Sequence, residues 1–199
     1  MKSIIIGIAL TTTILAACNE NSHQNGDNKK MDAAAKENNS IPKDAPAAYT
    51  KSTFVNTAMQ GMVGQYLQIK NALANDNGKD AANAGNAFVE SMGKMEKASL
   101  TADKKKTWDN LSDDAKEMAE HIGKNADKLE HQREHFDMLS KDMYDMVKAF
   151  GGGQTLYQDF CPMYNDKKGA TWLSETKEIK NPYLGKKMPT CGSVKEEIK

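Results

Sequence analysis

Apolar residues recur every three or four positions along most of the chain after residue 54, which is the spacing of one face of an α-helix. This pattern predicts four helices, over residues 55–73, 81–95, 101–122 and 129–150. The run Asn75-Asp76-Asn77-Gly78 has the composition of a turn and separates the first two helices.

The helix boundaries carry ordinary start and stop signals. Thr101 and Ser112 are each followed by an acidic residue within one turn, as at a helix N-cap, and the glycines at 151–153 terminate the last helix. Gly123 weakens the pattern before the last helix begins. The chain therefore either turns there or continues as one bent helix over 112–150.

Four amphipathic helices with short connections favour an all-α fold, an up-down-up-down four-helix bundle. No segment shows the apolar–polar alternation of a β-strand. The last forty residues differ in composition, because they concentrate proline, glycine and tryptophan. We expect an irregular C-terminal segment packed on the bundle, in one domain over 46–199.

The first seventeen residues have the composition of an export signal. Lys2 precedes an apolar run over 3–14 that is too short to stay in a bilayer as an anchor. The sequence Leu15-Ala16-Ala17-Cys18 resembles a bacterial lipobox, in which the cysteine is lipidated and becomes the new N-terminus. Residues 18–45 are polar and bury too little apolar surface to fold, so we expect a lipidated flexible tether.

Composition excludes several classes of function. The chain carries 27 basic and 27 acidic residues, and this balance argues against a nucleic-acid partner. The sequence has no Gly-x-Ser-x-Gly elbow, P-loop, dinucleotide-binding glycine pattern or His-Glu-x-x-His motif. We therefore expect a binding protein that is not an enzyme.

Methionine is abundant, with twelve residues, and this invites a copper-binding interpretation. Most of the methionines lie on or beside the apolar stripes, where a flexible thioether fills gaps in a core. We predict a structural role for these: Met59, Met62, Met92, Met95, Met118, Met143 and Met146.

Three histidines lie in the predicted bundle. His131 and His135 are four residues apart, so both lie on one face of the last helix and could bracket one ion, although solvated side chains have the same spacing. His121 lies near the end of the preceding helix. In an antiparallel hairpin it comes close to the first turns of the last helix, so His121 and His135 are expected to face one another.

Two cysteines remain outside the leader, each near a methionine in Cys161-Pro162-Met163 and Met188-Pro189-Thr190-Cys191. Thiolate, thioether and imidazole together suit Cu(I), and less well Zn(II). Two cysteines outside the cytoplasm are also commonly paired, and closing this loop would stabilise the fold by about 3–4 kcal/mol. Both a disulfide and a metal site remain open.

Several phrases of the chain carry a resemblance. They are Cys161-Pro-Met-Tyr-Asn, Gly169-Ala-Thr-Trp-Leu-Ser, Ile179-Lys-Asn-Pro-Tyr and Met188-Pro-Thr-Cys-Gly in the tail, with Ala119-Glu-His-Ile and Gln132-Arg-Glu-His-Phe on the helices. They resemble a Bacteroidota family of small lipoproteins with a domain of unknown function, over about residues 50–195. Similar domains are joined to heavy-metal-binding segments or to periplasmic adaptors of copper and silver efflux systems, which implies a role in periplasmic copper handling.

The resemblance also suggests a ligand set, from which His131 is absent. Leu184 and Pro189 depart from the residues that are commoner in the family and lie beside the suggested site. We therefore predict an envelope lipoprotein, at the outer membrane and facing the periplasm, that binds copper as Cu(I) and serves an efflux adaptor or another envelope protein. The alternative is a disulfide-stapled interaction module without metal. The predicted ligands are Cys161, Cys191, His121, His135, Met163 and Met188.

The lipid anchor can be tested at Cys18. Cys18→Ala removes the sulfur that would carry the lipid, so the variant should remain unprocessed or become soluble and leave the detergent-soluble membrane fraction. Fractionation followed by immunoblotting measures this, and unchanged membrane association would contradict the lipoprotein prediction.

Overall fold

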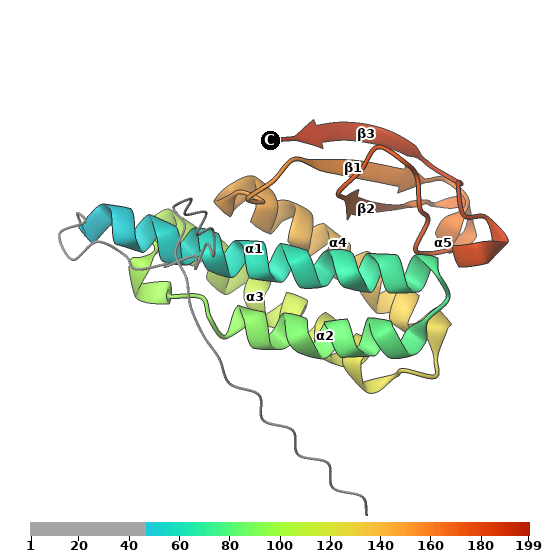
Figure 1. Cartoon of the computed structure of the whole chain (residues 1–199), viewed down its shortest axis with the longest axis horizontal. Coiled ribbons are helices and arrows are strands. Elements are labelled where there is room, and N and C mark those ends of the chain that lie inside the picture. Colours follow the sequence, from blue (N-terminus) through green and yellow to red (C-terminus); the bar gives the residue numbers. More distant parts are fainter. Residues whose placement is uncertain (1–46) are drawn as a thin grey trace, which may run out of the picture. The chain divides into compact units, whose positions relative to one another are not determined.

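The computed structural model describes residues 47–199, with side chains from residue 52 onward; the predicted leader, Cys18 and tether lie outside these residues. Four helices follow in order, α1 (Ala47–Ala74), α2 (Gly78–Met92), α3 (Ala102–Lys124) and α4 (Leu129–Phe150). Consecutive helices are antiparallel and pack on one another (Figure 1). The predicted all-α four-helix bundle is confirmed.

The predicted apolar stripes form the core of this bundle. The apolar face of α1 is buried along its length, and so are Phe88, Trp108 and Phe136 on the other helices. The buried residues of this face are Val55, Met59, Met62, Tyr66, Ile69 and Leu73. Met62, Met143 and Met146 are fully buried, as expected for thioethers that fill core gaps. Within residues 47–199, no helix is both long enough and apolar enough to span a membrane.

Most helix boundaries follow the sequence signals. The Asn77 side chain caps α2 by accepting from the Asp80 N–H at 3.1 Å, and Thr101 caps α3. Ser112 is not an N-cap, because α3 already starts at Ala102 and buries Ser112 in its interior. The chain leaves α3 at Asn125 and starts α4 at Leu129, so residues 112–150 form two helices and not one bent helix.

The C-terminal segment differs from the irregular structure expected. It contains a three-stranded antiparallel sheet of β1 (Leu156–Cys161), β2 (Ala170–Ser174) and β3 (Ser193–Ile198), in the order β2-β1-β3. The strands are short, and exposure does not alternate along β1 or β2. The β1–β3 pairing also has a bulge on β3: Gln158 pairs with Glu196 and Asp159 with Val194, so Lys195 is the extra residue. Strict alternation is therefore absent, which is why the strands escaped prediction.

Short turns complete the segment. The brief helical turn α5 (Tyr164–Lys167) connects β1 to β2, and η2 (Gly185–Lys187) lies between β2 and β3. A second 3-10 turn, η1 (Lys97–Ser99), lies outside this segment and connects α2 to α3. Gly169 closes the β1–β2 connection with φ 81°, where an added Cβ would meet the Phe160 ring, so this turn requires glycine.

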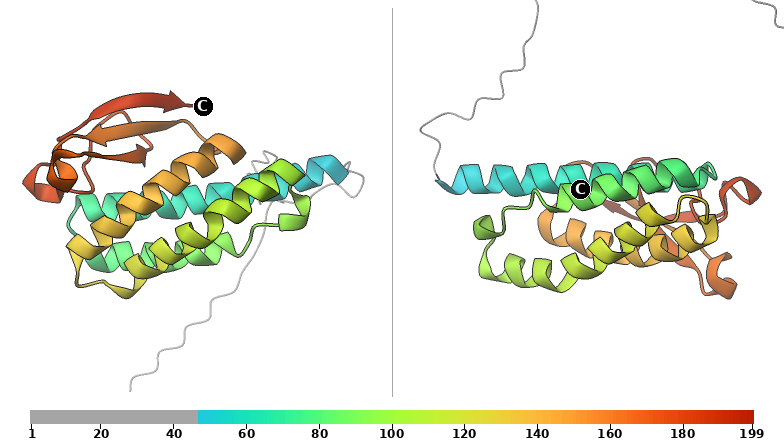
Figure 2. Two further views of the ribbon diagram at one scale, coloured as in Figure 1. Left: turned by 180° about the vertical axis from the view of Figure 1, so that it is seen from behind. Right: turned by 90° about the horizontal axis from the view of Figure 1, so that it is seen from below.

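The sheet packs over α4 and α1, with β2 in contact with both helices (Figures 1 and 2). A buried polar junction fixes it there. The Tyr66 hydroxyl lies 2.8 Å from the Ser140 hydroxyl and accepts the Leu173 N–H at 2.9 Å, which joins α1, α4 and β2. Because these groups are buried, losing one of them would leave its partners without a hydrogen bond.

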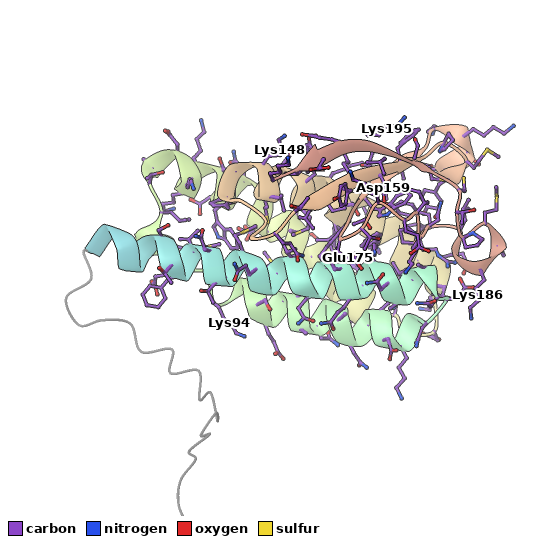
Figure 3. The ribbon with its side chains drawn as sticks, turned by 45° about the horizontal axis from the view of Figure 1, so that its top comes forward. Lys94, Lys148, Asp159, Glu175, Lys186 and Lys195 are labelled. Atoms are coloured by element: carbon purple, nitrogen blue, oxygen red, sulfur yellow. The ribbon has the colours of Figure 1, made fainter. Side chains whose placement is uncertain are left out.

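Charged side chains are also buried beneath the sheet (Figure 3). Lys70 of α1 is fully buried and pairs with Glu175 at 2.6 Å. Both carboxylate oxygens of Asp159, on β1, are buried and have no hydrogen-bond partner. Burial raises the pKa of Asp159 to about 7, with Lys70 opposing this shift and Glu175 adding to it.

A core substitution tests the bundle. Phe136 is fully buried and its ring stacks on Tyr66 at 5.1 Å between centroids. Phe136→Ala should lower the free energy of unfolding by about 3–5 kcal/mol, as measured by urea denaturation. Met138→Ala, on the same helix with Met138 40% exposed, is the matched control and should change it by about 0.5 kcal/mol or less. Equal effects would contradict the assigned core.

Asp159 predicts a pH dependence of stability. The native carboxyl keeps its proton to higher pH than the unfolded chain does, so its stabilising contribution is full below about pH 4 and is lost as the pH rises through about 7. Asp159→Asn should remove this loss, so the variant should gain stability relative to the wild type between pH 4 and 8. Unfolding curves across this range measure the difference, and a constant difference would be the contrary result.

Candidate metal site

Three histidines meet where α3 ends and α4 begins. One ligand nitrogen each from His121, His131 and His135 lie within 4.8 Å of one another, and we call these residues the histidine cluster. The Nε2 atoms of His131 and His135 are 3.1 Å apart, and the rings of His121 and His135 stack at 4.3 Å between centroids. His121 and His135 thus face one another as the hairpin geometry predicted.

The local fold explains why these side chains meet. His131 and His135 lie one turn apart on α4, and the short α3–α4 connection brings His121 alongside them. The buried Gln132 side chain donates to the carbonyls of Gly78 and Ile122, at 2.9 and 3.0 Å. These two hydrogen bonds fix the first turn of α4 against α2 and the end of α3, between the two cluster residues of α4.

Neighbouring groups orient the imidazoles. The Nδ1 atom of His135 lies 3.2 Å from the Met118 sulfur, a weak acceptor that favours the tautomer with a proton on Nδ1 and a free lone pair on Nε2. Carboxylates of Glu117 and Glu134 lie 3.8 Å from nitrogens of His121 and His131, respectively. Met118 is half-buried and packs against the core as predicted, and its sulfur also contacts the cluster.

The surroundings of His135 favour its neutral form. Burial lowers the pKa of His135, and the charges of His121 and His131 lower it further. A neutral imidazole is the form that binds a metal, so this environment favours the ligand form of His135.

The spacing fits a metal ion. Metal–nitrogen bonds of 2.0–2.1 Å in a tetrahedral site place two ligand nitrogens about 3.3 Å apart, and the His131 and His135 Nε2 atoms are already 3.1 Å apart. A small rotation of the half-exposed His121 would bring the third nitrogen to this distance. Three imidazoles on two well-fixed helices would leave one coordination position for a further ligand.

The cysteines form a separate pair in the C-terminal segment. The Sγ atoms of Cys161 and Cys191, the cysteine pair, lie 3.0 Å apart with both residues as free thiols. The sulfur contact with Cys161 raises the pKa of Cys191, burial raises it further, and the Met163 backbone N–H opposes both effects. Trp172 of β2 and Tyr183 are buried, and the Tyr183 ring lies 5.7 Å from that of Phe136 on α4.

The predicted six ligands therefore fall into two groups. Among the described residues, the only cluster of three or more possible His, Cys or carboxylate ligands is the histidine cluster, and neither cysteine belongs to it. It includes His131, which the resemblance had left out. Met163 and Met188 point to solvent, 47% and 43% exposed. The four-residue spacing of His131 and His135 was the sequence signal for including His131.

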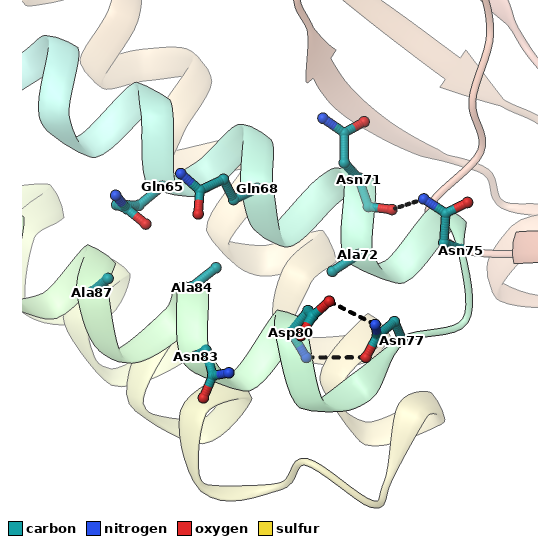
Figure 4. A pocket seen from close by; sticks show the side chains of 10 residues that line it. All are labelled: Gln65, Gln68, Asn71, Ala72, Asn75, Asn77, Asp80, Asn83, Ala84 and Ala87. Atoms are coloured by element: carbon teal, nitrogen blue, oxygen red, sulfur yellow. Dashed lines mark hydrogen bonds between the residues drawn. The ribbon is translucent and has the colours of Figure 1, made fainter. Parts of the chain in front are cut away.

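Five hollows on the surface of the described residues are lined by no histidine or cysteine. The one between α1 and α2 is lined mainly by amides and alanines (Figure 4), and two of its polar groups, Asn77 and Asp80, bond to each other at the start of α2. It contains no histidine or cysteine, so its side chains lack the ligands that a transition metal prefers.

The similarity of this chain to known proteins lies in its helical part. No curated protein and no solved structure matches the chain. Residues 62–155 match a family described as "Protein of unknown function (DUF3347)". This segment contains Met118 and the whole histidine cluster and ends just before β1, so the similarity covers the cluster and leaves the cysteine pair outside.

Proposed function

We propose that the histidine cluster binds a transition-metal ion, copper in first place, and that the protein serves copper homeostasis or efflux at the cell envelope. The observation that carries this proposal is the convergence of three imidazoles from two helices, with ligand nitrogens within 4.8 Å of one another. Imidazole is a preferred ligand of copper, zinc, nickel and iron.

A solvated or structural role explains the cluster less well. Protonated imidazoles at this spacing repel one another, and neutral ones leave lone pairs directed into a small space. Within residues 52–199, none of the three rings forms a hydrogen bond with the backbone; their close contacts are with one another, Met118 and two glutamates. A bound cation would accept those lone pairs, and the neutral imidazoles would not repel one another as protonated ones do.

Copper is favoured over the other ions by affinity and by setting. For a given set of nitrogen ligands, Cu²⁺ binds most tightly among the common divalent ions. His121 and His131 are partly exposed, so an ion can enter and leave from solvent, as a buffer or donor requires.

The envelope location is part of this proposal. It rests on the apolar leader that ends in Leu15-Ala16-Ala17-Cys18 and on the resemblance to lipoproteins related to efflux adaptors. A lipid anchor and a polar tether would hold the bundle near the membrane, where an efflux adaptor could accept the ion.

A second candidate is the disulfide-stapled interaction module. The 3.0 Å separation of the Cys161 and Cys191 sulfurs favours it, because oxidation would join β1 to the turn before β3 without rearranging the helices. This function would need no metal and would leave the histidine cluster as a surface feature.

Metal titration tests the first candidate. The reduced protein should bind one Cu(I) in competition with a colorimetric chelator. Loss of a residue that only orients a metal ligand weakens metal binding by about 10–100-fold. His121→Ala, His131→Ala and His135→Ala each remove a ligand and should weaken binding by more than this. Met118→Leu should weaken it by about 10-fold, because only the orientation of His135 is lost.

Two controls separate this site from the one predicted by the sequence. Met138→Leu changes an exposed thioether on α4 and should leave binding unchanged. The double variant Cys161→Ser/Cys191→Ser should also keep the site. If the cysteine variant loses copper while the histidine variants keep it, the thiolates are the ligands and the histidine proposal fails.

A further inference from the structure

The cysteine pair is not used by the proposed metal site, and its two sulfurs differ in access. Cys161 is fully buried at the end of the central strand β1. Cys191 is half-exposed, in the turn that precedes β3. A reagent from solvent therefore meets Cys191 first and reaches Cys161 only through it or through opening of the sheet.

The turn that carries Cys191 is held by hydrogen bonds that do not involve the sulfurs. The fully buried Asn181 donates from its side chain to the Cys191 carbonyl at 2.6 Å and from its backbone to the Pro189 carbonyl at 2.8 Å. The Cys191 N–H donates to the Met188 carbonyl at 3.2 Å. The turn thus keeps its place beside β1 whether or not the sulfurs are bonded.

Gly192 adds a steric reason for this placement. At φ 150°, a Cβ there would lie 2.9 Å from the Trp172 ring and 3.1 Å from the Phe160 carbonyl oxygen. The glycine lets the chain after Cys191 pass directly over β1 and β2, which brings the Cys191 sulfur within 3.0 Å of Cys161.

We propose that Cys161 and Cys191 are a thiol–disulfide exchange pair, in which Cys191 reacts with an external disulfide and Cys161 resolves the mixed disulfide. The sulfurs are already in contact as thiols and need to approach by only about 1 Å to bond. One backbone arrangement therefore serves both redox states, which a pair that cycles requires and an inert staple does not.

The reaction balances with the external disulfide R–S–S–R as oxidant. Cys191 loses its proton to solvent and attacks one sulfur, so the R–S–S–R bond breaks, a Cys191–S–S–R bond forms and R–S⁻ leaves with the electron pair. Cys161 then loses its proton and attacks the Cys191 sulfur, which expels the second R–S⁻. The protein loses two electrons and two protons, and both R–S⁻ ions become R–SH.

The surface beside Cys191 suits a peptide that carries the disulfide. Met163 and Met188 flank the pair in sequence and expose 47% and 43% of their surface. Exposed thioethers are flexible and apolar, so they adapt to varied side chains around a partner's sulfur. A small disulfide shares the same chemistry but would gain less from these methionines.

Trapping with oxidised glutathione tests the proposal on the full chain in a Cys18→Ala background, with a metal chelator present. Cys161→Ser should accumulate one glutathione on Cys191, because the resolving sulfur is gone. Cys191→Ser should react about tenfold or more slowly, since its remaining thiol is reached only through local opening. Mass spectrometry after acid quenching measures both adducts, and equal labelling of the two variants would overturn the assigned roles.

The wild-type cysteines provide a test that does not depend on a variant folding. The oxidised protein should be reduced by glutathione under native conditions, at a rate well above that of global unfolding and with an unchanged circular dichroism spectrum. Reduction only in denaturant would identify a permanent staple and overturn exchange.

The methionines are tested with two oxidants. Met163→Ser/Met188→Ser should react several-fold more slowly than the wild type with insulin as the disulfide, and at the wild-type rate with oxidised glutathione. If the variant and the wild type react equally fast with insulin, the pair is assigned to small disulfides.

Discussion

The guanidinium of Arg133 joins three parts of the chain that are far apart in sequence. It donates to the Leu73 carbonyl at 3.1 Å, to the Asp76 carboxylate at 2.5 Å and to the Pro182 carbonyl at 2.9 Å. Because Arg133 is almost fully buried, these bonds form away from water, and removing one partner would leave a buried charge poorly solvated. They outweigh the effect of partial burial and hold the pKa of Asp76 below its usual range.

The position of Arg133 in α4 extends this constraint to the candidate site. Its neighbour Gln132 is fixed by carbonyls of α2 and α3, so two adjacent side chains clamp the start of α4 to the other three helices and the tail. His131 immediately precedes this clamp, and His135 lies two residues after it, one turn beyond His131. The imidazoles are therefore presented by backbone that has little freedom, which is the condition for a site whose ligands need little reorganisation.

The sequence predicted those features that depend on local pattern. Helical spacing identified the four helices, and the hairpin between α3 and α4 placed His121 opposite His135. These predictions succeeded because each rests on periodicity or on the direct connection of neighbouring elements.

Other features depend on pairing between distant residues and left weaker signals. The strands lack the alternation that identifies a strand, and β3 has a bulge at Lys195. The sheet is specified by its fit over Tyr66 and Ser140 as much as by its own residues. The division of the six predicted ligands into two groups likewise depends on how the tail is oriented over α4. Periodicity carries no information on that orientation, so the sequence analysis joined the cysteines and the histidines in one site.

The outermost strand is attached differently from the rest of the tail. β3 is mostly exposed, and besides its pairing with β1 it is held by Glu196, which binds Lys148 at 2.6 Å and Tyr144 at 2.8 Å, and by Glu197, which pairs with Lys177 at 3.2 Å. Ion pairs at the surface weaken as dissolved salt screens them, whereas the buried bonds of Asn181 and Arg133 are screened much less. Ionic strength therefore acts selectively on β3, the strand that follows Cys191. Rising salt weakens the attachment of this edge strand while the helices keep their arrangement.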